Sequence, residues 1–366
     1  MSITARIFSL LCLTMLAAHA FAGEEKPDSL TWFDPSRWGV EGRGWTDVKR
    51  YYDRLPAHAV GLVRVQVWNL SRESAGMCVQ FKTDAQEIQV RYSLLHPALA
   101  MPHMAATGVS GADLYVRTEE GAWRWIGTVL PEDRVVRAPF VKHMAPGFRA
   151  YMIYLPLYNG VDSVAIGVPQ GARFEPVAPR QERPIVFYGT SIMQGACASR
   201  PGMAIPAILG RRLNVPTINL GFSGNGRMEP ELAGLLGEID AAVYALDCLP
   251  NLKSGEVRER VDAFVRKLRA VRPRTPILLV EDRVFPNAFI IPERAAGHEE
   301  AHAGLRVAYE QLTKEGIPGL FYLKGGDLLG SDGEATVDGS HPTDLGMVRY
   351  ADAYEEVLRR VLAGQK

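Results

Sequence analysis

The sequence has no excess of charge of either sign. Its 41 Lys and Arg residues balance 41 Asp and Glu residues, which gives a formal net charge of +0. A balanced chain offers no electrostatic reason to bind nucleic acid or an anionic membrane. Beyond residue 30 the chain also lacks an apolar run long enough to span a bilayer. We therefore expect no nucleic-acid partner and no integral membrane segment in the mature chain.

Cysteine is scarce as well, with four residues in the whole sequence. Cys12 lies in the N-terminal segment, and the other three are Cys78, Cys197 and Cys248. Three cysteines do not make a disulfide framework, and at most one bridge can form. Cys197 and Cys248 are the pair to test for that bridge. The alternative is that all three are small buried apolar side chains.

The N-terminus has the three parts of an export signal. Arg6 supplies a positive charge, residues 7–18 form an apolar core, and Ala20-Phe21-Ala22 is a small-x-small cleavage site. We therefore expect residues 1–22 to be a signal peptide and the mature protein to be periplasmic or extracellular. The alternative is a buried N-terminal helix. Cys12 lies inside the apolar core, which does not favour a lipoprotein anchor.

The remaining chain is 47% hydrophobic and 22% charged over 366 residues in total, a globular composition that suggests about two domains. Residues 24–45 show no period and are expected to be an extended lead-in. From residue 57 the pattern alternates, as in residues 61–68, where Val63, Val65 and Val67 would share one face of a strand. Further candidate strands are 79–83, 87–94, 113–117, 122–129, 148–157 and 163–168. About seven short strands predict an all-β sandwich, jelly-roll-like, over residues 24–172.

A proline-rich, charged segment at 173–183 is expected to connect this part to a second domain at 184–366. There, short apolar strands at 185–188, 217–220, 241–246, 277–280 and 320–323 alternate with helical stretches. The helices include 293–314, 345–362 and an amphipathic one with Ser254 as its expected N-cap. This alternation predicts an α/β fold, a doubly wound domain with a five-stranded parallel sheet.

Polar residues suited to acyl transfer follow these strands. Ser191 comes after the first strand, Gly221 and Gly224 after the second, and Asn251 after the third. Asp338 and His341, three positions apart, come after the fifth. Active groups of such sheets gather where strands end. A serine, a histidine oriented by a carboxylate and nearby N–H donors are the parts of a serine hydrolase.

The order of these residues resembles the SGNH hydrolase (GDSL-type esterase) superfamily. The resemblance implies that Ser191 is the nucleophile, His341 the general base and Asp338 the residue that orients it. It also implies an oxyanion hole made by the N–H groups of Ser191 and Gly224 and the side chain of Asn251. Gly221 is the other candidate for the glycine.

Two blocks depart from the family pattern and one further block supports it. The first block reads Gly189-Thr190-Ser191 where the family has Gly-Asp-Ser. The third reads Leu249-Pro250-Asn251-Leu252 where the family has Gly-x-Asn-Asp. The stretch Gly111-Ala112-Asp113-Leu114-Tyr115 is similar to the Gly-x-Asp-Leu-Tyr signature of a β-domain that precedes SGNH esterases.

The resemblance implies an exported esterase that needs no metal and no other cofactor. Its substrate would be a small-molecule or polysaccharide ester, with short acyl groups such as acetyl and acylated carbohydrate as the expected class.

Two other functions are compatible with parts of the sequence. His298-Glu299-Glu300-Ala301-His302 matches His-Glu-x-x-His on a predicted helix, the zinc-binding pattern of metallopeptidases. The continuation of that pattern and a third ligand are missing. Six tryptophans of the β-rich half could stack on sugars in a non-catalytic carbohydrate-binding protein, although most such residues fill a core. They are Trp32, Trp38, Trp45, Trp68, Trp123 and Trp125.

Overall fold

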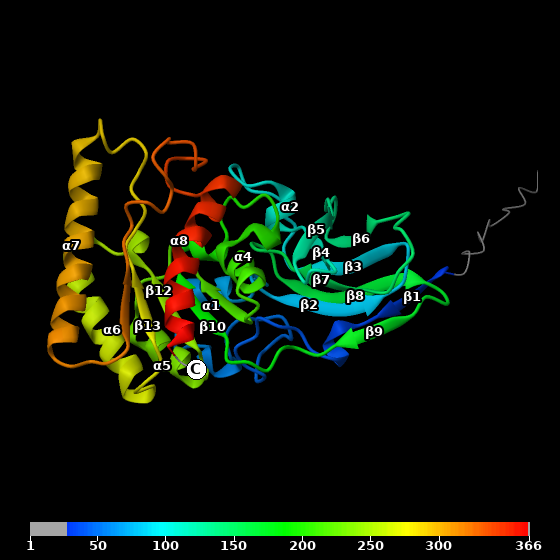
Figure 1. Ribbon diagram of the computed structural model, residues 1–366, viewed down its shortest axis with the longest axis horizontal. Coiled ribbons are helices and arrows are strands. Elements are labelled where there is room, and N and C mark those ends of the chain that lie inside the picture. Colours follow the sequence, from blue (N-terminus) through cyan, green and yellow to red (C-terminus); the bar gives the residue numbers. More distant parts are fainter. Residues whose placement is uncertain (1–27, 365–366) are drawn as a thin grey trace, which may run out of the picture.

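The computed structural model describes residues 28–364, and Figure 1 shows a β-rich part beside an α/β part. The β-rich part is a pair of antiparallel sheets with the strand orders β1-β8-β3-β6 and β5-β4-β7-β2-β9. Phe81 of one sheet and Val90 and Ile166 of the other belong to one buried apolar cluster. The predicted N-terminal β-sandwich is confirmed. The expected signal peptide lies outside the described residues.

The strands of this part are β1 (Leu30–Phe33), β2 (Cys78–Thr83), β3 (Ile88–Leu94), β4 (Asp113–Arg117), β5 (Trp123–Thr128), β6 (Val135–Val141), β7 (Arg149–Tyr154), β8 (Val161–Pro169) and β9 (Phe174–Val177). Six of the expected strands correspond to β2, β3, β4, β5, β7 and β8. β1 lies in the expected lead-in, and β9 lies in the expected connection, where it pairs with β2. The unpredicted β6 contains Pro139 and lies at the edge of its sheet, where a proline costs no ladder hydrogen bond.

Residues 61–68 do not form the predicted strand, because their second half lies in helix α1 (Val65–Leu70). Val65 is 63% exposed, whereas Val63 and Val67 are buried. Val63 and Val67 are four positions apart but do not lie in one helix, because Val63 precedes α1 and the N-cap Arg64 has an extended ψ of 147°. The two valines are buried from successive turns and not from one face of a strand. The same spacing extends backwards, and the row Leu55, Ala59, Val63 and Val67 packs into an apolar core of the α/β part.

The α/β part has five parallel strands in the order β11-β10-β12-β13-β14. They are β10 (Ile185–Gly189), β11 (Thr217–Gly221), β12 (Val243–Asp247), β13 (Ile277–Val280) and β14 (Leu320–Leu323). The helices are α3 (Ser191–Gln194), α4 (Ile205–Arg212), α5 (Pro230–Glu238), α6 (Val257–Val271), α7 (Pro292–Lys314) and α8 (Asp344–Ala363), and α2 (Ala106–Val109) belongs to the β-rich part. The predicted doubly wound α/β fold is confirmed.

Helices cover both faces of this sheet (Figure 1). Helices α4 and α8 pack on the face that carries Phe187 and Ala245, and α5, α6 and α7 pack on the face that carries Tyr188 and Leu246. Ser254 is not the N-cap of α6: it begins a short 3-10 turn, and its hydroxyl donates to Glu300 at 2.7 Å. Of the helices within residues 28–364, none combines the length and apolarity needed to cross a membrane.

The Gly-x-Asp-Leu-Tyr segment joins the two parts. Both carboxylate oxygens of Asp113 accept the Gly202 N–H, at 3.1 and 3.2 Å. A Cβ on Gly202 would lie 2.5 Å from the Tyr115 ring, so only glycine fits beneath that ring. Leu114 points the other way, into the sandwich core. The segment therefore fixes the β-rich part to the loop that follows α3.

Candidate active site

Ser191 lies at the turn between β10 and the short helix α3. Thr190, where the family pattern has aspartate, is the N-cap of α3, and its hydroxyl accepts the Ile192 N–H at 3.3 Å. The turn is tight, because a Cβ on Gly189 would lie 2.6 Å from the Asp247 carbonyl oxygen. Ser191 is 8% exposed. Its hydroxyl is thus held at the carboxyl edge of the sheet.

The structure brings Ser191, His341 and Asp338 into one hydrogen-bonded chain. Ser191 Oγ lies 2.9 Å from His341 Nε2, and His341 Nδ1 lies 2.7 Å from Asp338 Oδ2. Asp338 Oδ1 accepts the backbone N–H groups of Ser340 and His341, at 2.9 and 2.8 Å. The carboxylate therefore fixes His341 with Nδ1–H as donor, which leaves the Nε2 lone pair for the hydroxyl proton of Ser191.

Asp338 is held in its charged form. Partial burial alone would raise its pKa, but the hydrogen bonds from the His341 side chain and from two backbone N–H groups outweigh that effect and lower the pKa to about 2. Asp338 therefore remains a carboxylate, and an orienting partner for His341, through the whole range from weakly acidic to alkaline pH.

The two candidate oxyanion glycines differ in structure. The Gly221 N–H donates to the Asn219 side chain at 2.9 Å, and a Cβ on Gly221 would lie 2.2 Å from the Gln194 backbone nitrogen. Gly221 is therefore a packing glycine. Gly224 has a φ of +67° and open space where a Cβ would be. Within residues 28–364 the Gly224 N–H has no acceptor, so it is available to a ligand.

Asn251 lies in the turn η4 (Leu249–Asn251) beyond β12. Its Oδ1 accepts the Gly226 N–H at 3.2 Å. This bond sets the orientation of the amide and leaves the Nδ2–H groups to donate elsewhere. The altered sequence around Asn251 thus retains an oriented amide donor beside the loop that carries Gly224.

Sequence reasoning missed a polar network beneath the Gly224 loop. Gln194, one helical turn after Ser191, accepts the Ser223 N–H at 3.0 Å and donates to the Leu157 carbonyl at 3.1 Å. Its amide nitrogen also bonds the Glu73 carboxyl. Burial raises the pKa of Glu73 to about 7, against the opposing charge of Arg54. The position of Gln194 in the helix that begins at Ser191 was a usable signal, but the sequence gives none for Glu73.

Arg54 is the second element that sequence reasoning missed. It is 1% exposed, and it donates to the carbonyls of Glu73 at 2.8 Å, Leu70 at 2.7 Å, Asn219 at 3.1 Å and Gly221 at 2.7 Å. Complete burial lowers its pKa to about 10. One guanidinium from the N-terminal half thus fixes the end of β11, where the loop to Gly224 begins.

Asp247, the last residue of β12, is a fully buried carboxyl near this edge. Its Oδ2 accepts the Tyr354 hydroxyl at 2.6 Å, and its Oδ1 has no partner among the described residues. Burial raises its pKa to about 7, and the Tyr354 bond opposes that shift. A carboxyl with a raised folded-state pKa contributes stability that is complete below its unfolded pKa, near 4, and is lost as the pH rises through about 7.

Asp247→Asn should therefore flatten the pH dependence of stability. Between pH 5 and pH 8 the wild type should lose about 2–3 kcal/mol of unfolding free energy through this group, and the variant should not. The asparagine Oδ1 can still accept the Tyr354 hydroxyl, so the two proteins should be similar at pH 5. Urea unfolding at both pH values measures this difference. An equal loss in both proteins would contradict the assignment.

The His-Glu-x-x-His pattern does not assemble a metal site. His298 Nε2 accepts the Phe285 N–H at 3.2 Å, and His302 Nε2 lies 2.9 Å from the Asp282 carbonyl oxygen. Both imidazole rings thus form hydrogen bonds with backbone groups of the segment that follows β13. Among the described residues, no group of three possible metal ligands includes either histidine. The zinc-peptidase hypothesis receives no support.

The carbohydrate-binding hypothesis receives no support from the tryptophans, four of which pack against apolar cores. As predicted for most of the tryptophans, apolar cores take up Trp38, Trp45, Trp68 and Trp123, whereas arginines lie against Trp32 and Trp125.

The disulfide suggested between Cys197 and Cys248 is absent, because both cysteines are free and buried.

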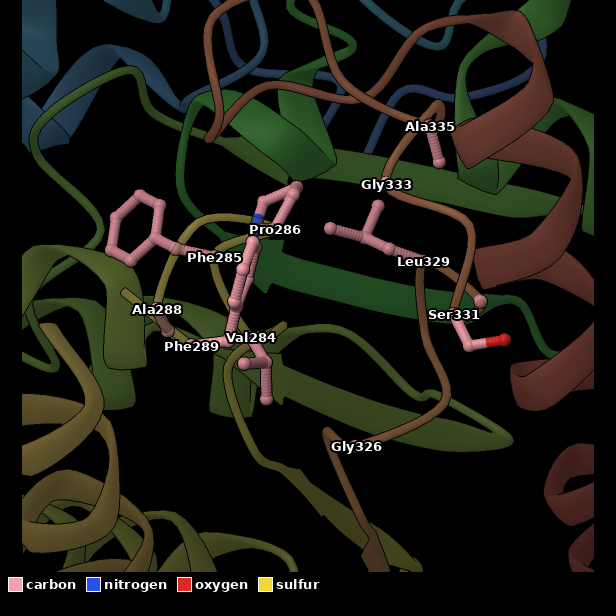
Figure 2. Close-up of a pocket in the computed structure, with 11 residues that line it drawn as sticks. Val284, Phe285, Pro286, Ala288, Phe289, Gly326, Leu329, Ser331, Gly333 and Ala335 are labelled. Carbon is pink, nitrogen blue, oxygen red and sulfur yellow. The ribbon is translucent and has the colours of Figure 1, made fainter. Parts of the chain in front are cut away.

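Two cavities open among the loops at this end of the α/β part. Figure 2 shows one of about 420 Å³, lined mainly by apolar side chains of residues 284–289 and 326–335. The other, of about 380 Å³, is lined by the direct sequence neighbours of Asn251 and His341, namely Pro250, Leu252 and Ser340. Arg283, Glu293 and Arg294 add charged groups to it. The second cavity is the better candidate for substrate, because its walls continue from the candidate catalytic residues.

Comparisons with known proteins find two family matches that together cover most of the chain. Residues 182–359 match the GDSL-like Lipase/Acylhydrolase family, and residues 30–174 match the GxDLY family, described as the N-terminus of Esterase_SGNH_hydro-type. No curated protein sequence matches the chain.

Three solved structures illustrate the similarity. A GDSL-like lipase from Bacteroides ovatus is 32% identical, with a TM-score of 0.87 over 91% of this chain and 98% of its own. A salicylyl-acyltransferase from a tetracycline biosynthetic pathway is 18% identical, with a TM-score of 0.72 over 92% and 98%. A family two carbohydrate esterase from Cellvibrio japonicus is 12% identical, with a TM-score of 0.59 over 92% and 99%. The last two share the fold.

Proposed function

Since the chain belongs to the GDSL-like lipase/acylhydrolase family and is an ester-acting hydrolase, we propose that it cleaves carboxylic esters with a catalytic triad. In this triad Ser191 is the nucleophile, His341 is the general base and Asp338 is the carboxylate that orients His341. One observation carries this proposal: the continuous hydrogen-bonded chain from Ser191 Oγ through His341 to Asp338.

The reaction then has two halves. His341 Nε2 takes the hydroxyl proton as Ser191 Oγ attacks the ester carbonyl, and the same imidazolium returns that proton to the departing alcohol. Water, deprotonated by His341, attacks the acyl-serine and releases the carboxylic acid and the free serine. Asp338 stabilises the imidazolium in both halves through its bond to Nδ1–H.

The oxyanion of each tetrahedral intermediate needs donors that face the carbonyl oxygen. Three groups support such a hole: the Ser191 N–H at the start of α3, the unpaired Gly224 N–H and the Nδ2–H of Asn251. Preorganised donors of this kind stabilise the charge that develops in the transition state.

The proposed substrate is a short-acyl ester of a hydroxyl-rich alcohol, such as an acetylated carbohydrate. The charged side chains at the 380 Å³ cavity support it, because Glu293 and Arg294 can pair with hydroxyl groups, whereas Arg283 is buried and bonded to Ser340 and Asp282. One structural relative is named as a carbohydrate esterase, which agrees with this choice.

We also propose that the protein is exported, because residues 1–22 have the three parts of an export signal. N-terminal sequencing of the exported protein should then find a mature chain that begins at Gly23.

The proposal is tested by covalent labelling together with a substrate panel. A fluorophosphonate should modify the wild type once, on the peptide that contains Ser191, and should leave Ser191→Ala unmodified in intact-mass spectra. Short- and long-chain nitrophenyl esters, acetylated xylan and other acetylated glycans then define the acyl length and the alcohol. Stoichiometric labelling of Ser191→Ala, or hydrolysis of no ester in the panel, would refute the proposal.

A further inference from the structure

A second chemical feature lies at the candidate active site. The ligand atoms of His103, Cys197 and His341 all lie within 4.8 Å of one another, and within residues 28–364 this is the one such group of three possible metal ligands. The His103 and His341 rings have centroids 5.5 Å apart. Both histidines are partly exposed, so an ion can reach them from solvent. Neither His103 nor Cys197 has a part in the proposed ester hydrolysis.

The fold builds this cluster from three distant segments. His103 lies in a turn of the β-rich part that is closed by two backbone bonds between Met101 and Met104, at 3.0 and 3.1 Å. The turn leads into α2, which is seated on the loop after the nucleophile helix: the Thr107 hydroxyl donates to the Ser199 carbonyl at 2.6 Å. A Cβ on Gly108 would lie 2.2 Å from the Ala198 carbonyl oxygen. This close docking holds the His103 turn against the Cys197 loop.

Cys197 has an unusual backbone for a residue with a side chain. Its φ is +69°, in the left-handed region that favours glycine. It forms no disulfide. Burial among apolar residues explains a small side chain at this position, but alanine would serve that purpose and glycine would relieve the strain. Packing alone therefore does not account for a thiol in this conformation beside two imidazoles.

His341 is already oriented as a metal ligand. Its Nδ1–H is bound to Asp338, and metal-bound histidines characteristically donate their second nitrogen to a carboxylate in this way. Two imidazole nitrogens and one thiolate are ligands that select Zn²⁺ over Mg²⁺ or Ca²⁺. A tetrahedral Zn²⁺ would hold these ligand atoms about 3.3–3.6 Å apart, so the cluster, whose ligand atoms lie within 4.8 Å of one another, would close slightly around the ion.

We propose that His103, Cys197 and His341 bind Zn²⁺, with the fourth position left to water, and that the bound ion switches hydrolysis off. On binding, the Cys197 thiol releases its proton to solvent and coordinates as thiolate, and His341 gives its Nε2 lone pair to the metal. Ser191 then loses its proton acceptor. The inhibitory consequence rests on the proposed function, whereas the binding site itself does not.

Cobalt spectroscopy tests the site directly. The metal-free full-length mature protein, kept reduced with a phosphine, is titrated with Co²⁺ alone. We expect a thiolate-to-cobalt charge-transfer band in the near ultraviolet that saturates at one equivalent and disappears on addition of Zn²⁺. The band should be absent from Cys197→Ser and from Cys197→Gly, the variant that suits the backbone conformation. It should persist in Ser191→Ala, because Ser191 is not a ligand.

Inhibition provides the second measurement. With a nitrophenyl ester as substrate, Zn²⁺ should inhibit the wild type, and the inhibition constant should rise at least about tenfold in His103→Ala and in Cys197→Ser. Each rate is normalised to the same variant without metal. His58→Ala is the matched control, because His58 is an exposed histidine paired with Glu238, and its inhibition constant should equal that of the wild type.

The outcomes separate this proposal from the proposed function. No charge-transfer band, a band that survives in Cys197→Ser, or equal inhibition of His103→Ala and the wild type would overturn the zinc site. Hydrolysis that is unaffected by Ser191→Ala would overturn the catalytic proposal, and the cobalt band would still report on the metal site.

Discussion

His341→Ala should lower kcat for a short-chain nitrophenyl ester by about 10⁴–10⁶-fold, with a much smaller change in KM. The imidazole is the acceptor for the Ser191 proton at 2.9 Å, and the structure places no other base within hydrogen-bond reach of that hydroxyl among the described residues. Without it the hydroxyl must attack as a neutral nucleophile. The residual rate should come from the oxyanion donors and substrate binding. Steady-state kinetics with enzyme freed of host esterases measures the effect.

A double variant makes this prediction sharper. In the proposed mechanism Ser191 and His341 act as one unit, so Ser191→Ala/His341→Ala should be no slower than either single variant by more than a few-fold. His58→Ala, which removes an exposed histidine outside the triad, should retain wild-type kinetics. If the two losses multiplied instead, Ser191 and His341 would act in separate steps, and the triad mechanism would be wrong.

The place of the candidate site in the fold could be predicted from the sequence, because the active groups of a parallel sheet gather where its strands end. Parallel strands all end at one edge, so Ser191, Asn251 and His341 could be assigned to one place although up to 150 residues separate them. The departure at Thr190 also has a local explanation, since threonine caps the helix that begins at Ser191. The family match and the strand order confirm the family and the fold from which this reasoning started, and the roles of the site residues stay a prediction.

The features that sequence reasoning missed depend on contacts between segments that are distant in the sequence. The buried row of Leu55, Ala59, Val63 and Val67 repeats every four residues, but the exposed Val65 makes residues 63–67 look like strand alternation in the sequence. Strand β9 is short and borders prolines, and only its pairing with β2 reveals it. Arg54 resembles any surface arginine until the carbonyls it bonds are brought together by folding.

Arg54→Met should therefore be among the most destabilising single substitutions in the chain. Methionine keeps the apolar length of the side chain but removes every donor. The carbonyls of Glu73, Asn219 and Gly221 then lose the bonds they accept from the buried guanidinium, and the Leu70 carbonyl keeps only the bond from the Glu73 N–H. An unsatisfied buried acceptor costs about 1–3 kcal/mol, and relaxation recovers part of the sum. We expect a loss of about 3 kcal/mol or more in unfolding free energy, measured by urea unfolding.

Arg50→Met supplies the matched control for this prediction. Arg50 is 43% exposed in its side chain and lies 3.9 Å from Asp162, so the same substitution there should change stability by no more than about 0.5 kcal/mol. Arg54→Lys should lie between the two, because a single ammonium cannot reach carbonyls on both halves of the protein at once. If Arg54→Met cost less than about 1 kcal/mol, those carbonyls would have other donors, and Arg54 would not be what fixes the end of β11 beneath the Gly224 loop.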